Sequence, residues 1–106
     1  MAGDSKAEND PVMRFRIAEV YMESQQWDKA LNELVLAEEL FERSKEFPDV
    51  WKQRIWFGRA LVHKVLFQYP MALIYIRKAD SFPKLTDVVM KEDIMFRTAE
   101  LLFLNL

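Results

Sequence analysis

Apolar residues recur along this chain at intervals of three and four positions, the spacing that places them on one face of an α-helix. Asp10-Pro11 is a favourable helix start, and polar or proline-containing breaks then divide the pattern into five segments. The predicted helices cover residues 11–23, 28–46, 50–67, 70–81 and 86–105. Short links between helices favour antiparallel neighbours, so the pattern predicts an all-α fold.

Two stretches of the chain read as copies of each other. The first is Trp27-x-x-Ala30-x-x-x-Leu34-x-x-Ala37, and 42 residues later the second reads Tyr69-x-x-Ala72-x-x-x-Ile76-x-x-Ala79. A fixed internal period of this kind predicts stacked helical hairpins, an architecture that binds partners more often than it catalyses reactions. The small residues would let helices approach closely, so we expect the whole motif to lie in the core.

Upstream of each copy, the chain resembles the first helix of the tetratricopeptide repeat. Over residues 11–44, Ile17-Ala18 stands for that family's Leu-Gly pair and Tyr21 for its tyrosine. In the second unit, Phe57-Gly58 looks like the Leu-Gly pair, with Leu61 in place of the tyrosine. The proline that ends the family's repeat is absent from the first unit, so its second helix is expected to extend.

The resemblance implies a short α-solenoid of two antiparallel tetratricopeptide-like hairpins plus a C-terminal helix. Residues 86–105 resemble a lone first helix or a capping helix. The domain would span residues 11–106, after a disordered tail over residues 1–10. The 42-residue step is longer than the family's usual step of about 34 residues. In this it is similar to the long-helix versions in kinesin light chains and cell-polarity adaptors.

The composition narrows the class of protein. A chain of 106 residues is long enough for one domain, and two glycines and four prolines leave little room for β-turns. The absence of cysteine excludes a disulfide scaffold, a thiol nucleophile and zinc–thiolate sites. Its apolar stretches are too short for a bilayer, and its start lacks the apolar run of a signal peptide. We therefore expect no membrane association and an intracellular protein, either cytoplasmic or nuclear.

The net charge of −2 is unevenly spread. Residues 1–49 hold twelve acids and six bases, whereas residues 50–84 hold seven bases and one acid. One interpretation is two solvated faces of opposite sign that attract each other, and the other is a basic patch for an acidic peptide. Nucleic-acid binding would favour a net basic domain, and this chain has a pI of about 5.4.

The residues that catalysis requires are scarce. His63 is the only histidine and lies on a predicted helix among apolar residues, so we expect a groove or core position for it. No glycine-rich loop is available for a phosphate, and Glu38-Glu39 is most simply a solvated pair. We therefore expect no enzyme activity, no cofactor and no metal site.

The resembled family binds its ligands in a concave groove lined by first-helix residues at fixed offsets. Members that grip the acidic tails of chaperones have lysine and asparagine where this chain has Phe15 and Glu19, which argues against that activity. The apolar stripe instead suits an amphipathic helix or an extended apolar peptide, unless neighbouring helices of the same chain bury it. Carried onto this sequence, the groove positions are Phe15, Glu19, Met22, Ile55, Arg59, Val62, Phe96, Glu100 and Phe103.

The end of the sequence adds a second candidate surface, because five of its last six residues are large and apolar. One helix cannot bury them all against a single neighbour, and an exposed patch of this size usually marks an interface. The chain would then continue, pair with a copy of itself, or be covered by a partner. The function expected is a protein–protein interaction module, such as an adaptor, scaffold or assembly subunit. The alternative is a structural subunit that dimerises through Leu101, Leu102, Leu104 and Leu106.

Overall fold

The computed structural model describes residues 10–44, 48–81 and 88–106, and within these ranges it contains helices and no strand. The predicted all-α fold is therefore confirmed. The predicted disordered tail, apart from Asp10, lies outside the described residues. The helices are α2 (Pro11–Glu23), α3 (Trp27–Arg43), α4 (Asp49–Val65), α5 (Tyr69–Asp80) and α6 (Val88–Leu104).

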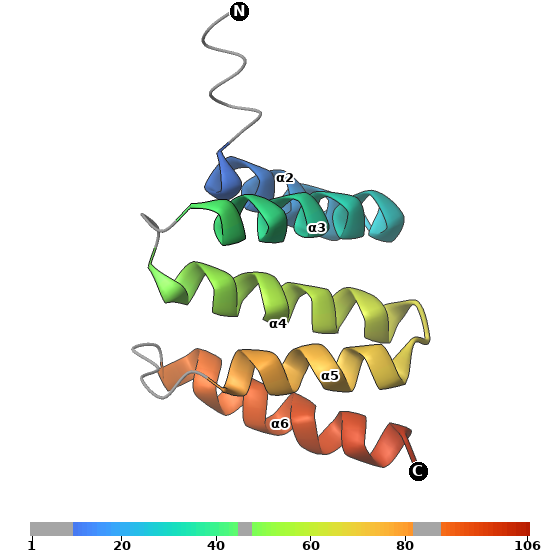
Figure 1. Ribbon diagram of the computed structural model, residues 1–106. Coiled ribbons are helices and arrows are strands. Elements are labelled where there is room, and N and C mark those ends of the chain that lie inside the picture. The colour runs from blue at the N-terminus through green and yellow to red at the C-terminus, as the bar shows by residue number, and fades with distance from the viewer. Residues whose placement is uncertain (1–9, 45–47, 82–87) are drawn as a thin grey trace, which may run out of the picture.

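The helices run back and forth in a single row, each antiparallel to the one before it (Figure 1). α2 packs on α3 and α4 packs on α5, which makes two hairpins. Contacts of α3 with α4 join the hairpins, and α6 packs on the outer side of α5. The predicted arrangement of two antiparallel hairpins and a final helix is the one observed.

The first helix begins as the sequence predicts. The backbone N–H of Val12 donates to Asp10 Oδ1 at 2.9 Å, and Pro11 occupies the first turn, where its missing N–H costs nothing. The sequence favours Asp28 as the N-cap of the second helix, but α3 begins at Trp27, with Gln26 in the capping position. Asp28 therefore lies within the first turn, where its carboxylate faces the positive end of the helix dipole.

The turns inside the two hairpins have the same geometry. Gln25 and Phe67, which are 42 positions apart, both adopt a left-handed conformation, with φ of 61° and 62°. In each turn the next residue is a glutamine whose N–H donates over 2.8 Å to a carbonyl five residues earlier, as in a Schellman motif. These carbonyls belong to Tyr21 and His63. The 42-residue period therefore includes the end of the first helix of each hairpin as well as the second helix.

This equivalence corrects the expected alignment of the first helices. A step of 42 residues from Ile17-Ala18 leads to Arg59-Ala60, whereas the sequence interpretation placed Phe57-Gly58 there. The burial pattern agrees, because Ala18 and Ala60 are both buried, at 0% and 1% exposure. The residue equivalent to Tyr21 is then His63, not Leu61.

The core consists of two clusters that share α4. The first lies among α2, α3 and α4, and the second among α4, α5 and α6. α4 contributes Ile55 and Val62 to the first cluster and Ala60 to the second, so it is buried on two faces. Every alanine of the repeated motif is fully buried, as are Leu34 and Ile76, which confirms the expected core. Trp27 and Tyr69 are half-buried and pack against these clusters.

Enlarging one of the motif alanines should strain the core. We expect Ala37→Leu to lower the free energy of unfolding by about 1–3 kcal/mol, because the added atoms have no space between α3 and its neighbours. Urea denaturation followed by circular dichroism would measure it. The matched control is Ala99→Leu, the same change at an exposed alanine. Equal stabilities for the two variants would contradict the expected packing.

Candidate functional site

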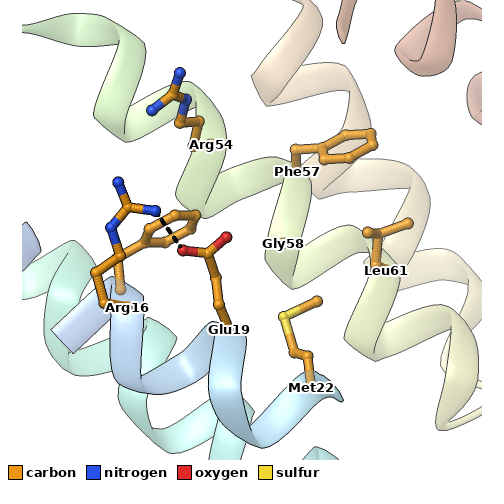
Figure 2. A pocket seen from close by; sticks show the side chains of 8 residues that line it. Arg16, Glu19, Met22, Arg54, Phe57, Gly58 and Leu61 are labelled. Atoms are coloured by element: carbon orange, nitrogen blue, oxygen red, sulfur yellow. Dashed lines mark hydrogen bonds and ion pairs between the residues drawn. The ribbon is translucent and has the colours of Figure 1, made fainter. Parts of the chain in front are cut away.

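One candidate site is a hollow of about 540 Å³ between α2 and α4, the first helices of the two hairpins. In Figure 2, Arg16, Glu19 and Met22 lie on α2, whereas Phe57 and Leu61 lie on α4 and point away from α2. Gly58 contributes only backbone to the wall. The residues lining the hollow are Phe15, Arg16, Glu19, Met22, Arg54, Phe57, Gly58 and Leu61.

A second hollow, of about 350 Å³, extends the first one toward α6. The two share Met22 and Leu61, so together they form one continuous groove along the first helices. We call this surface the α2–α4 groove. The second hollow adds Glu23, Trp27, Lys64, Val65 and Arg97.

The two ends of the groove differ in charge. Near the start of the helices, the guanidinium groups of Arg16 and Arg54 lie 5.5 and 4.8 Å from the centre of the Trp51 ring. Arg16 also pairs with Glu19 at 3.0 Å, whereas no carboxylate of the described residues pairs with Arg54. This end therefore carries two positive charges and one negative charge, which favours an acidic group.

At the other end of the groove the positive charges are already neutralised. Lys64 forms an ion pair with Glu100 on α6. Arg97 pairs with Asp93 at 3.1 Å, and its guanidinium lies 6.0 Å from the centre of the Phe57 ring. Between the two ends, the exposed surface of the groove comes mainly from apolar side chains.

The structure brings together the groove residues predicted on the first unit. Phe15, Glu19 and Met22 all line the hollow. Phe15 is only 7% exposed, because its ring packs edge-on against Trp51 at 5.9 Å. It therefore forms the floor of the groove, and the accessible surface belongs to its neighbours.

The prediction for the second unit is wrong. Ile55 and Val62 are 0% exposed and lie in the core, so they cannot contact a partner. The guanidinium of Arg59 pairs with Glu38 on α3 at 2.6 Å and lies 3.9 Å from the centre of the Tyr75 ring, away from the groove. The cause is the two-residue error in alignment, because two residues rotate a helix by about 200° and select the opposite face.

The correct residues follow from the period that the second helices display. Adding 42 to Phe15, Glu19 and Met22 gives Phe57, Leu61 and Lys64, and all three line the groove. The sequence therefore contained the signal. It was missed because the Leu-Gly-like pair Phe57-Gly58 was aligned by residue type instead of by period.

The three groove positions predicted on α6 differ in their contacts and exposure. Glu100 reaches the groove through Lys64, as expected of a groove position. Phe96 and Phe103 line neither hollow and are 67% and 73% exposed. No further helix of the described chain covers these two phenylalanines.

One of the predicted oligomer-interface residues is wrongly placed. Leu101 is 1% exposed and packs in the core beside Ile94, seven residues earlier on the same face of α6. It cannot contribute to an interface in the folded chain. Leu102 and Leu106 are exposed, at 43% and 101%, and Leu104 is half-buried.

His63 is a core residue without catalytic partners. Its ring stacks on Tyr75 at 5.5 Å, and Nδ1 lies 2.7 Å from Gln68 Oε1, an acceptor, so Nδ1 carries the proton. Nε2 is buried and has no hydrogen-bond partner among the described residues. Burial lowers the pKa of His63 below its ordinary value of 6.5; the bond to Gln68 opposes this shift, and the charge of Arg59 adds to it.

Acidification should therefore destabilise the fold through His63. Above pH 6.5 the ring is neutral in both states and has no effect; below it, the unfolded chain binds a proton that the folded chain resists. The free energy of unfolding should fall by up to about 1.4 kcal/mol per pH unit from this group. Urea denaturation at pH 7.5 and 5.5 should show a smaller loss for His63→Gln than for the parent chain. An equal loss would contradict the expected shift.

Other candidate chemistry is limited. Only one residue of the pair Glu38-Glu39 is solvated as expected. Glu39 is exposed, whereas Glu38 accepts hydrogen bonds from Arg59 and Trp56. In the described part of the chain, no three histidine or acidic side chains converge as metal ligands would. The described helices also include none with the length and apolar character that a bilayer crossing needs.

Comparison with known protein families, curated proteins and solved structures finds no match for this chain.

Proposed function

We propose that this chain is a protein-interaction module of the tetratricopeptide type, an adaptor or assembly subunit that holds an apolar segment of a partner in the α2–α4 groove. The observation that carries the proposal is the 540 Å³ hollow, which has Met22, Phe57 and Leu61 beside Arg54, a side chain that pairs with none of the described carboxylates. A hollow of this size accepts a large side chain of a bound peptide. In this proposal the chain acts inside the cell, without catalysis and without a cofactor.

The charges of the groove define the partner segment further. The guanidinium carbon of Arg54 lies 4.8 Å from the centre of the Trp51 ring, and no carboxylate of the described residues pairs with this side chain, so its N–H groups can bind a carboxylate. We therefore propose a segment in which an aspartate or glutamate stands close to an aromatic or large aliphatic residue. The apolar side chain would fill the space beside Phe57 and Leu61, and the acid would pair with Arg54.

The repeat architecture supports the use of this face. In stacked hairpins the first helices together form an extended binding surface. Here α2 and α4 supply equivalent residues to one groove, as the pairs Phe15 and Phe57, and Met22 and Lys64, demonstrate. A segment lying along the groove would contact both hairpins at once.

Selection from a displayed random-peptide library on the purified chain would test the proposal. We expect enrichment of peptides with an acidic residue near a large apolar one. Synthetic versions should bind at least about 30-fold more weakly to Leu61→Glu, since loss of a buried anchor at an interface costs about 2 kcal/mol or more. Arg54→Glu should also weaken binding and should shift the selection toward basic peptides.

The matched control is Val20→Glu, which introduces the same charge at an apolar position on α2 that is 62% exposed and lines neither hollow. Its peptide affinity should equal that of the parent chain. If no peptide is enriched, or if Leu61→Glu and Val20→Glu bind the selected peptides equally, the groove is not the binding site.

A further inference from the structure

α6 repeats the central helix of the molecule. α4 and α6 each have 17 residues, and α6 begins and ends 39 positions after α4 begins and ends. Ile55 and Val62 of α4 are fully buried against the first hairpin, and the same step leads to Ile94 and Leu101, which α6 buries against α5. α6 is therefore equivalent to the first helix of a third hairpin.

The equivalence identifies a face of α6 on which no second helix of the described chain packs. In the complete hairpins, Ala18 of α2 and Ala60 of α4 are 0% and 1% exposed, because α3 and α5 lie over them. The corresponding residue of α6 is Ala99, and it is exposed. Beside it, Met95 and Leu102 are 62% and 43% exposed. We call Met95, Ala99 and Leu102 the outer face of α6.

We propose that the outer face of α6 binds one amphipathic helix of a partner protein, packed antiparallel to α6 as α3 packs on α2 and α5 on α4. The two existing interfaces define the chemistry of this helix. α3 and α5 each pack on a first helix, and each has two fully buried alanines seven residues apart. An equivalent helix would set its alanines near Ala99 and let Met95 and Leu102 pack on either side.

A second copy of this chain fits the outer face less well. The matching alanine stripes of the chain are those of α3 and α5, and all four alanines are already buried at 0% exposure. Two α6 helices placed together would set Met95 and Leu102 of one against those of the other, around a single alanine on each. The alanine stripes of the described chain are therefore not available to a second copy.

A peptide with the sequence of residues 26–44, constrained as a helix by a side-chain lactam, is a suitable probe. It reproduces α3 and can be titrated into the intact chain while the methionine methyl signals are followed by NMR. We expect the Met95 signal to shift, while those of Met13 and Met22 on α2 stay unchanged. A peptide with glutamate at both alanine positions should produce no shift.

The peptide affinities of three variants of the chain test where the peptide binds. Ala99→Glu should weaken the peptide at least tenfold while circular dichroism remains unchanged, because Ala99 is exposed in the folded chain. Val20→Glu and Leu61→Glu should bind the peptide like the parent chain, which separates this surface from the α2–α4 groove.

Three results would overturn the proposal. The first is an unshifted Met95 signal with a peptide whose helicity circular dichroism confirms. The second is a shift at Met13 and Met22, which would mean that the peptide replaces α3 on α2. The third is a dimer of the chain alone, seen by light scattering and converted to a monomer by Ala99→Glu, which would assign the outer face to a second copy.

Discussion

Replacing Leu34 by alanine is expected to lower the free energy of unfolding by about 3–5 kcal/mol. Leu34 is 0% exposed, and α4 approaches it so closely that a Cβ on Gly58 would lie 3.3 Å from Leu34 Cδ2. Truncation removes the side chain that fills the space between the two hairpins. Because small domains have about 5–15 kcal/mol of stability in total, the variant should lose a large share of it.

Urea denaturation followed by circular dichroism would measure this loss. The control is Leu36→Ala, two residues later on the same helix, where the side chain is 41% exposed and the loss should be far smaller. Gly58→Ala supplies a second check. Its Cβ crowds Leu34 in the parent chain, but in the Leu34→Ala variant it should fill part of the cavity and restore stability. If Gly58→Ala has the same effect in both backgrounds, the two residues do not pack as described.

The helices were the most predictable part of this molecule. Helical periodicity located all five, and the observed ends differ from the predicted ones by a few residues. Periodicity is reliable here because each helix buries at least one continuous stripe. The exact starts depend on local capping, and Asp28 shows the difficulty, since an aspartate is as favourable within the first turn as at the cap.

The candidate site was only half predictable, because α4 has two buried faces. A stripe read from sequence does not reveal which neighbour covers it. Gly58 looked like the small residue beneath the second helix of its own hairpin, but its close contact is with Leu34 of the preceding hairpin. The small residue of its own hairpin is Ala60. The 42-residue period of the second helices and the turn geometry repeated at Gln25 and Phe67 both give the correct alignment.

The charge pattern indicates that oppositely charged segments attract each other, but it does not identify which residues pair. The sequence suggested that acidic and basic segments attract each other, and Glu38 with Arg59 is one such pair between the hairpins. Which acid meets which base depends on helix packing, so pairing across 21 residues was out of reach of the sequence. Arg59 was consequently assigned to the groove, although it lies on the other side of α4.

The second large effect is expected at this ion pair. Glu38 accepts a bond from Arg59 at 2.6 Å and from Trp56 Nε1 at 3.3 Å, and the side chains of the pair are only 16% and 13% exposed. Glu38→Ala leaves Arg59 almost buried without a carboxylate, since Tyr75 covers its guanidinium at 3.9 Å. Removing one partner of a buried pair strands the other charge, so we expect a loss of about 3 kcal/mol in the free energy of unfolding.

A double variant separates the stranded charge from the lost contacts. In Glu38→Ala with Arg59→Met, the methionine keeps apolar packing against Tyr75 and removes the charge, so much of the stability should return. The matched control is Glu39→Ala at the exposed neighbouring position, which should change stability by no more than about 0.5 kcal/mol. Urea denaturation at low and at high salt would measure the free energy of unfolding of the parent chain, the two single variants and the double variant. If Glu38→Ala and Glu39→Ala lose equally little, the pair does not hold the hairpins together, and the contact between α3 and α4 depends on Leu34 and Gly58 instead.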